Sequence, residues 1–347
     1  MVIRGRGAVV VIAALAALAP ARARAGDPAA APVDLVAALA PDAGAAVATA
    51  VLVGRSGQLY HPVAPGRWQR RTVGGVAVDL RGAVRSRARA DEVLAIGADT
   101  PPFRFAGGAW HAEPLSNRGP TALTATGPLP VLVVGRHVYT LEGGAWVRRA
   151  SAAHRVTAAW AAGPTDLIVA VEDGRVTRSN GRRFTPLRSP LPAGESIVAL
   201  CGATPAAVFG RSEKGTWIRI DRSGAVAIAP AGDVPGFEEH AWGPGPDGAL
   251  WLAGTAPAGG GRRALLLRAD RNRMVAAADI PAVADGDRVV VVLGQPSTGE
   301  ILIATAAGVV RVRDKKGTWS EGSASSALPP LPSPPAGGRS GAPARTR

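Results

Sequence analysis

Seven short apolar runs recur along this chain at nearly even spacing, and this recurrence limits the fold more than any other feature. Their starts lie 36 to 52 residues apart, and the runs are AVLVG (50–54), VLAIG (93–97), VLVVG (131–135), LIVAV (167–171), AAVFG (206–210), ALWLAG (249–254) and ILIAT (301–305). Each run is short and bounded by turn residues, which is typical of a buried strand rather than a helix. The chain is therefore expected to be a repeat protein built from strands.

The residues around the runs repeat as well. An earlier apolar stretch and a glycine- or proline-containing turn lead into most of the runs, with the glycine at Gly127, Gly163, Gly202, Gly243 or Gly294. A turn, another short strand such as RHVYTL or GVVRVR, and a glycine shortly before a bulky residue come after the run. Glycine suits such hairpins because it reaches positive φ without steric cost. Each repeated unit is therefore predicted to contain four short strands in roughly forty residues.

A single four-stranded sheet cannot bury both of its faces, but sheets stacked radially around an axis cover one another. The predicted fold is accordingly all-β, a β-propeller of seven four-stranded blades. Two β-sandwiches, the other all-β interpretation, explain neither the even spacing nor the shared register of the repeated features. The bulky residue of each last hairpin is expected to wedge between neighbouring blades, and these wedges are Trp68, Trp110, Trp146, Phe184 and Trp319, with weaker counterparts at Val226 and Met274.

Two stretches resemble known propeller repeats. VGRHVYTLEGGAWVRR resembles the Asp-box and YCF48-type repeats, whose pattern is roughly S-x-D-x-G-x-T-W. Thr140, Glu142, Gly144 and Trp146 match it approximately, and DKKGTW keeps the ending but shifts the acid to Asp314. GPGPDGALWLAGT (243–255) resembles the repeat of streptogramin lyases and two-component-regulator propellers, in this blade alone. These resemblances imply a hairpin type and a fold, and they imply no activity because propellers carry unrelated functions.

The two ends of the chain differ from the repeats. Residues 1–25 have a short basic head, an apolar run and the sequence Ala23-Arg24-Ala25, which together predict a secretory signal peptide; an uncut membrane anchor is the alternative. Residues 26–322 are assigned to the propeller, and residues 323–347, rich in Pro, Ser, Gly and Ala, to a disordered tail. The expected location is secreted or periplasmic, with no membrane span after signal removal.

The formal net charge of +14 includes two local clusters of arginine, RWQRR (67–71) and RGAVRSRAR (81–89). They are interpreted as solvated strand faces, with a patch for anionic glycans, lipid headgroups or nucleic acid as the alternative. Aromatic residues are not interleaved as base-stacking platforms, so no nucleic-acid partner is expected.

Residues able to do chemistry are sparse. The densest polar cluster is Glu238, Glu239 and His240, a weak candidate for a metal site that is more simply explained as an acidic loop and a strand-edge histidine. Cys201 lies in the apolar string SIVALCG and is expected to be a buried core thiol, while Tyr60 and Tyr139 occupy equivalent packing positions. We therefore assign no catalytic residue and no cofactor.

The sequence thus predicts a monomeric, non-enzymatic binding or scaffolding module of the cell envelope. Its partner is expected to be a protein or glycan held at one face of the propeller. The alternative function is a propeller-type enzyme, a lyase or glycan hydrolase, with a site on one face of the central channel.

Overall fold

The computed structural model describes residues 33–325 except 40–44, 72–75, 77–78, 86–91, 98–99, 114, 116–121, 125–128, 181–182, 233, 260 and 285. The predicted signal peptide and residues 326–347 of the predicted tail therefore lie outside the described residues. No helix in the described part of the chain is long and apolar enough to cross a bilayer.

The described residues form 28 strands in consecutive groups of four, and each group is one antiparallel blade. Blade 1 consists of β1 (Leu35–Leu39), β2 (Val51–Gly54), β3 (Leu59–Ala64) and β4 (Arg67–Arg70), and blade 2 consists of β5 (Leu80–Arg85), β6 (Val93–Gly97), β7 (Phe103–Ala106) and β8 (Ala109–Ala112). Blade 3 consists of β9 (Ala122–Thr124), β10 (Val131–Val134), β11 (His137–Glu142) and β12 (Ala145–Ser151). Blade 4 consists of β13 (Val156–Gly163), β14 (Asp166–Val171), β15 (Val176–Ser179) and β16 (Phe184–Leu187). Blade 5 consists of β17 (Ile197–Thr204), β18 (Ala207–Ser212), β19 (Trp217–Ile220) and β20 (Ala225–Ile228). Blade 6 consists of β21 (Glu238–Pro244), β22 (Leu250–Ala258), β23 (Gly261–Asp270) and β24 (Arg273–Asp279). Blade 7 consists of β25 (Val289–Gln295), β26 (Glu300–Thr305), β27 (Val309–Arg313) and β28 (Trp319–Ser325).

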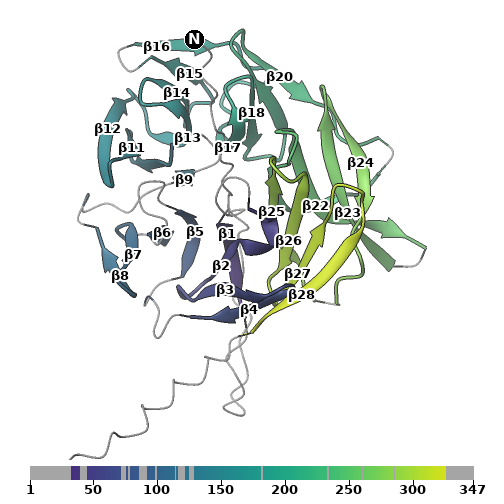
Figure 1. The fold of residues 1–347 in the computed structure, drawn as a ribbon. Helices are drawn as coiled ribbons and strands as arrows, with labels where there is room; N and C mark the ends of the chain where they lie inside the picture. Colours follow the sequence, from purple (N-terminus) through teal and green to yellow (C-terminus); the bar gives the residue numbers. More distant parts are fainter. Residues whose placement is uncertain are drawn as a thin grey trace, which may run out of the picture.

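The blades are arranged in a ring (Figure 1). The first strands, such as β1, β5 and β17, lie near the centre, and the fourth strands, such as β12, β16 and β24, lie at the periphery. The seven apolar runs fall on the second strand of every blade, where their side chains are almost entirely buried. The fold predicted from the repeat, an all-β propeller of seven four-stranded blades, is confirmed.

Blades 1 and 7 close the ring by joining into one eight-stranded sheet. The outer strands β4 and β28 pair in parallel, with Ser323 opposite Arg67 and Ala324 opposite Trp68, and the Ser323 N–H donates to the carbonyl oxygen of Gly66 over 2.9 Å. A Cβ atom on Gly322 would lie 2.2 Å from that Gly66 oxygen, so the close approach of the two strands requires glycine there. Residues 323–325 therefore belong to β28, and the predicted tail boundary at 323 is wrong by three residues.

Four tryptophans of the outer strands pack against the preceding blade. Trp68 is 2% exposed in a cluster that includes blade 7 residues such as Leu293. Trp110 donates its indole N–H to the Gly57 carbonyl of blade 1 over 2.9 Å, and Trp319 donates to the Asp279 carbonyl at the end of blade 6 over 3.0 Å. Trp146 contacts the clusters shared with blade 2. Met274, one of the weaker counterparts, is buried against blade 5.

Phe184 does not wedge between blades, and this assignment is wrong. It is 37% exposed and belongs to no buried cluster among the described residues, and Val226 is similarly 42% exposed. The tryptophans stand two residues after their glycine, whereas Phe184 stands three after Gly181. The strand register is nevertheless the same: Phe184 lies opposite Ser179 as Trp146 lies opposite Leu141, so both are on the side of their blade that faces the preceding blade. The difference is that the residue opposite Phe184 is polar, whereas Leu141 is buried beside Trp146.

The hairpins between third and fourth strands explain the GGAW sequence that occurs twice. Gly143 and Gly144 have φ of 58° and 85°, the pair of positive values that a two-residue type I′ turn requires. In DKKGTW the Asp314 carboxylate accepts the N–H groups of Lys316 and Thr318, each over 2.8 Å. Asp314 stands at a different sequence position from the acid of the Asp-box pattern, but its carboxylate still stabilises the hairpin between the third and fourth strands.

Replacing Trp68 by alanine is expected to lower the free energy of unfolding by about 3–5 kcal/mol, because a large, nearly fully buried side chain is lost from the ring closure. The matched control is Phe184→Ala on another outer strand, for which about 0.5 kcal/mol or less is expected because the ring is exposed. Urea denaturation monitored by circular dichroism measures both. Equal losses in the two variants would contradict the assigned packing.

A second test concerns Asp247, in the turn between β21 and β22. Burial by itself raises the pKa of Asp247, but hydrogen bonds from the Arg268 guanidinium, the Trp251 indole and the Ala249 N–H outweigh it and hold the pKa below its ordinary value. A lowered carboxyl pKa contributes stability that is present above the unfolded-state pKa of about 4 and is lost as the pH falls through the folded-state value.

Asp247→Asn is therefore expected to lower Tm by a few degrees at neutral pH. The gap to the unmodified protein should close as the pH falls below about 4, where aspartate itself becomes neutral. Thermal melts across a pH series measure the gap, and a gap that persists unchanged into acid would count against the ionic role of Asp247.

Candidate functional site: a pocket between blades 6 and 7

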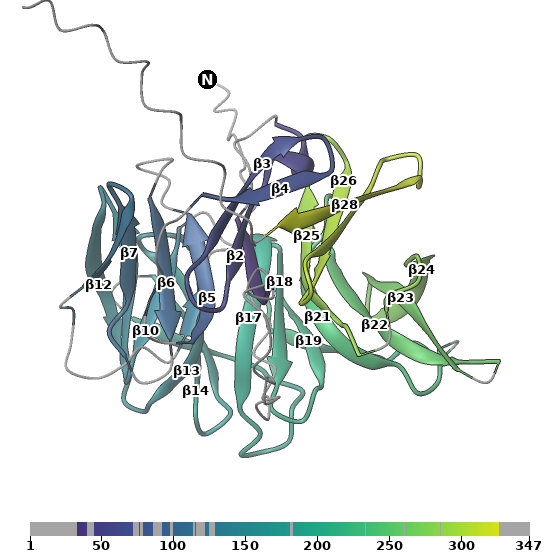
Figure 2. The ribbon, with the colours of Figure 1, turned by 90° about the horizontal axis from the view of Figure 1, so that it is seen from below.

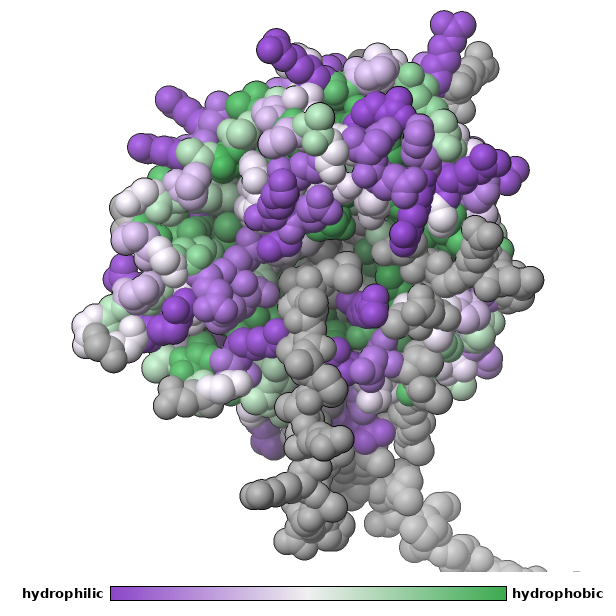
Figure 3. Space-filling model, turned by 180° about the vertical axis from the view of Figure 1, so that it is seen from behind, coloured by the Kyte–Doolittle hydropathy of each residue, from purple (hydrophilic) through white to green (hydrophobic). Residues whose placement is uncertain are grey.

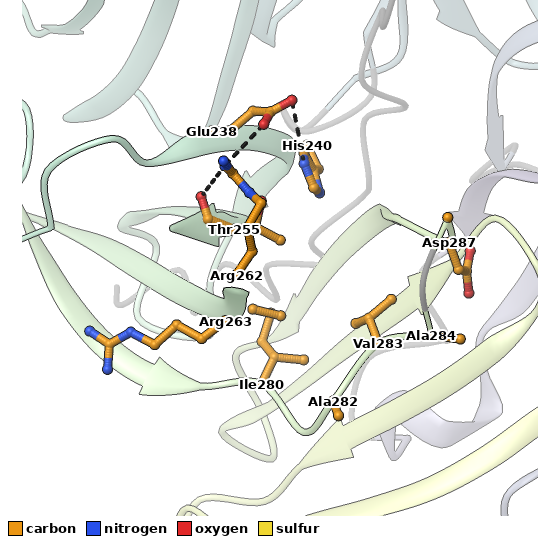
Figure 4. Close-up of a pocket in the computed structure, with 12 residues that line it drawn as sticks. Glu238, His240, Thr255, Arg262, Arg263, Ile280, Ala282, Val283, Ala284 and Asp287 are labelled. Carbon is orange, nitrogen blue, oxygen red and sulfur yellow. Dashed lines mark hydrogen bonds and ion pairs between the residues drawn. The ribbon is translucent and has the colours of Figure 1, made fainter. Parts of the chain in front are cut away.

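A pocket of about 490 Å³ lies between blades 6 and 7. It opens where β21 begins and where the segment from Ile280 to Asp287 links β24 to β25 (Figure 4). We call this end of the ring, which carries the links from one blade to the next, the linker face. The volume falls within the range of small-molecule and side-chain binding sites.

The polar wall of the pocket comes from blade 6. Arg262 of β23 pairs with the Glu238 carboxylate at 3.0 Å and donates to the Thr255 hydroxyl over 2.9 Å and to the Thr255 carbonyl over 3.2 Å. His240 stands two residues after Glu238 on β21, and its Nε2 lies 3.9 Å from that carboxylate. Figure 4 shows Glu238, His240 and Arg262 grouped on one side of the pocket.

The pKa of His240 lies below its ordinary value. Burial is the largest cause, and the nearby charges of Arg288 and Arg262 act in the same direction, while Glu238 opposes them. The imidazole is therefore neutral at physiological pH, with one ring nitrogen able to donate and the other able to accept a hydrogen bond.

The opposite wall is apolar and comes from the segment between the two blades. Ile280 is buried, Val283 is partly buried, and both side chains line the pocket together with Ala264 of β23. Beyond Val283, Asp287 closes the far side (Figure 4). The pocket thus combines an apolar wall with a wall of paired charges.

Two blade 7 contacts fix this segment in place. Arg311 of β27, whose side chain is 7% exposed, is held by Glu321 at 2.9 Å and donates to the Ala282 carbonyl over 2.7 Å. Asp287 accepts the N–H groups of Arg288 and Ala307 over 2.8 and 3.0 Å. The pocket wall is therefore anchored to blade 7 although it follows blade 6 in the chain.

The structure separates the three residues of the predicted metal cluster. Glu238 and His240 share the pocket, but Glu239 lies on the opposite face of β21 because successive strand side chains alternate. There it accepts the Trp217 indole N–H over 2.8 Å and pairs with Arg211 at 2.8 Å, and burial raises its pKa against both of these partners. In the described residues, no three His, Cys, Asp or Glu side chains are placed to hold a metal together.

Other residues singled out in the sequence lie elsewhere. Cys201 is fully buried next to blade 6, and burial raises its thiol pKa, which suits a core residue rather than a nucleophile. Tyr60 is 2% exposed in the blade 1 core, and Tyr139 packs in blade 3. Burial, and then the charges of Arg71 and Arg85, lower the pKa of His61, so one arginine from each basic cluster acts on the same histidine.

Sequence reasoning did not find this pocket. Its residues come from three strands and one link, and none of them forms a motif. The available signal was the insertion APAGGGRR (256–263), which lengthens β22 and β23 beyond the strands beside them. The face seen in Figure 3 mixes hydrophilic side chains with small hydrophobic patches, so no large apolar surface on the described part of that face competes with the pocket as a site.

Replacing Arg311 by alanine is expected to free the Ala282 carbonyl and to speed amide hydrogen exchange at Val283 and Ala284 about tenfold, because a charge-assisted hydrogen bond is lost. Arg313→Ala, two residues along the same strand, is the control and should leave those amides unchanged. Exchange followed by mass spectrometry tests this, and equal rates in all three proteins would show that Arg311 does not hold the segment.

No family model and no curated protein matches the sequence. Solved structures do match, among them YCF48 from Cyanidioschyzon merolae, with a TM-score of 0.54 and 15% identity over 81% of this chain and 95% of that one. The WD40 β-propeller domain of Doa1 gives a TM-score of 0.53 and 14% identity over 83% and 96%. A structure of YCF48 bound to D1 peptide gives 0.51 and 14% over 71% and 81%. At such identities the likeness concerns the fold alone, and by its repeats, topology and structural neighbours this chain is a β-propeller.

Proposed function

We propose that this protein is an exported, non-enzymatic binding or scaffolding module of the cell envelope that holds a protein or peptide partner on its linker face. The observation that carries the proposal is the pocket between blades 6 and 7, where an apolar wall faces a wall of mutually paired charges. Such a combination suits an apolar side chain of a partner surrounded by polar contacts.

The chemistry of the pocket favours binding over catalysis. Among the residues that line it, His240 is the one imidazole, and its carboxylate neighbour stands 3.9 Å away, beyond hydrogen-bond distance. Arg262 is already engaged by Glu238 and Thr255. These groups serve better to orient a bound chain than to transfer protons or to stabilise a developing charge.

The structural neighbours support a protein or peptide partner. One of the similar structures is that of YCF48 with D1 peptide, and another is a WD40 domain. Propellers commonly bind on the faces where the loops between strands converge, and the pocket is on such a face. We propose a monomer, because the ring is closed within one chain.

Export is proposed on the sequence of residues 1–25 alone. Expression of the full chain in a bacterium, followed by fractionation and N-terminal sequencing, tests it. A mature protein that begins at Gly26 in the periplasm or medium is expected, and retention of Met1 in the cytoplasm would remove the envelope part of the proposal.

The binding role is tested by co-purification of partners from envelope extract with two single variants. Val283→Asp places a charge on the apolar wall of the pocket and is expected to reduce partner recovery at least about tenfold. Val226→Asp changes an exposed valine on blade 5 and should recover partners like the unmodified protein. Equal recovery with both variants would place the binding site elsewhere.

A further inference from the structure

The hairpin of β22 and β23 is longer than the blade to which it belongs. β21 pairs with β22 only as far as Thr255, and β24 pairs with β23 only from Leu265 onward. Residues 256–258 and 261–264 therefore continue as a two-stranded ribbon beyond both neighbouring strands, with Pro257 opposite Arg262. In Figure 2 the hairpin lies at the right-hand end of the ring.

The outer edge of β23 in this ribbon has backbone groups directed away from β22. The Ile280 N–H donates to the Ala264 carbonyl over 2.9 Å, so the backbone of Ala264 faces the side of β24. The register between β22 and β23 is unbroken here, and the direction of backbone groups alternates along an antiparallel strand. The N–H and C=O of Arg262 therefore also face the side of β24, where no strand follows.

The opposite edge of the ribbon is protected. On β22, Pro257 has no N–H to offer, and Gly236 packs against its ring, since a Cβ there would lie 3.2 Å from the proline Cδ and Cγ. Proline and covering segments are the usual means of blocking strand edges. On the β23 side the chain itself leaves the edge, because Pro281 follows Ile280 and the segment turns away toward blade 7.

The pocket adjoins this edge and extends from it across the face of blade 6 toward Glu238 and His240 of β21. Arg262, Arg263 and Ala264 line one side of it, and Ile280 and Val283 line another (Figure 4). An unpaired strand edge and an adjoining apolar pocket are the two elements used by proteins that bind peptides through strand addition.

We propose that an extended segment of a partner protein docks by adding a strand to the β23 edge beside Arg262. One residue of the incoming strand exchanges both backbone hydrogen bonds with Arg262, and a neighbouring apolar side chain enters the pocket against Ile280 and Val283. This inference rests on the proposed peptide-binding function and specifies how the partner is held.

The charges around the edge define the partner further. Glu238 and Asp287 carry two negative charges, Arg262 and Arg263 carry two positive charges, and His240 is neutral. Among the described residues that line the pocket these charges sum to zero, so recognition rests on backbone hydrogen bonds and an apolar side chain more than on net charge. Affinity should consequently change little between low and physiological salt, unlike that of a charge-driven complex.

The test uses peptides selected on the unmodified protein from a random peptide display library, with affinity measured by fluorescence anisotropy. Arg262→Pro removes the outward N–H but leaves the hydrogen bonds to β22 intact, and it is expected to weaken binding about tenfold or more. Arg262→Ala keeps that N–H and loses exposed side-chain contacts with Glu238 and Thr255, so a change below about fivefold is expected. Circular dichroism and thermal melts verify that both variants fold.

A second measurement does not depend on a protein variant. N-methylation of the selected peptides at single backbone positions should abolish binding at alternate positions only, as in a strand that pairs along one edge. If peptide affinity is unchanged by Arg262→Pro and by N-methylation but is lost with Val283→Asp, strand addition is wrong and the proposed binding function is retained. Failure to select peptides sensitive to Val283→Asp would overturn both.

Discussion

The whole ring depends on the pairing between the first and last blades. Every blade is made of four consecutive strands, so no blade combines strands from the two ends of the chain, and closure rests on non-covalent contacts alone. These include the parallel pairing of β4 with β28, the burial of Trp68 against blade 7 and the hydrogen bond from the Val47 N–H to Glu300. The one cysteine cannot add an intrachain disulfide, so burial and backbone pairing must suffice.

Closure also determines the binding face. Blade 7 is held on one side by blade 1, and on its other side it anchors the segment that forms the apolar wall of the pocket, through Arg311 and Asp287. Blade 6 contributes the opposite wall through a hairpin that outgrows its neighbours. The pocket therefore lies where a regular blade meets an extended one, and the closed ring holds the blade that anchors its apolar wall from both sides.

The fold could be predicted from the sequence because the same pattern of strands and turns occurs in one repeat after another. The apolar runs, the glycines of the hairpins and the tryptophans two residues later predicted strand order and blade number, since strand alternation and turn geometry act within a few residues. The error at Phe184 has another origin, because Phe184 occupies the same register position as Trp146 but lies opposite the polar Ser179 instead of a leucine. The tail boundary was misplaced because the composition of residues 323–325 gives no sign that β4 pairs with them.

The site was less accessible to prediction because it is made by contacts between blades. Glu238, Glu239 and His240 are adjacent in sequence, yet strand alternation sends Glu239 toward Arg211 and Trp217 while the other two face the pocket. Arg262 and Val283 belong to no motif, and their proximity follows from how blades 6 and 7 meet. The insertion at 256–263 was visible in the sequence, but its meaning depends on where β21 and β24 stop.

Amide hydrogen exchange in the unmodified protein tests the closed ring most directly. The Ser323 amide, which donates to Gly66 across the closure, should exchange as slowly as amides between interior strands such as β13 and β14. The outward-facing amides of β16, an outer strand with no strand beyond it, provide the reference for an unpaired edge. Exchange of Ser323 as fast as that reference would mean that blades 1 and 7 are not joined in solution, and the account of both the ring and its binding face would be contradicted.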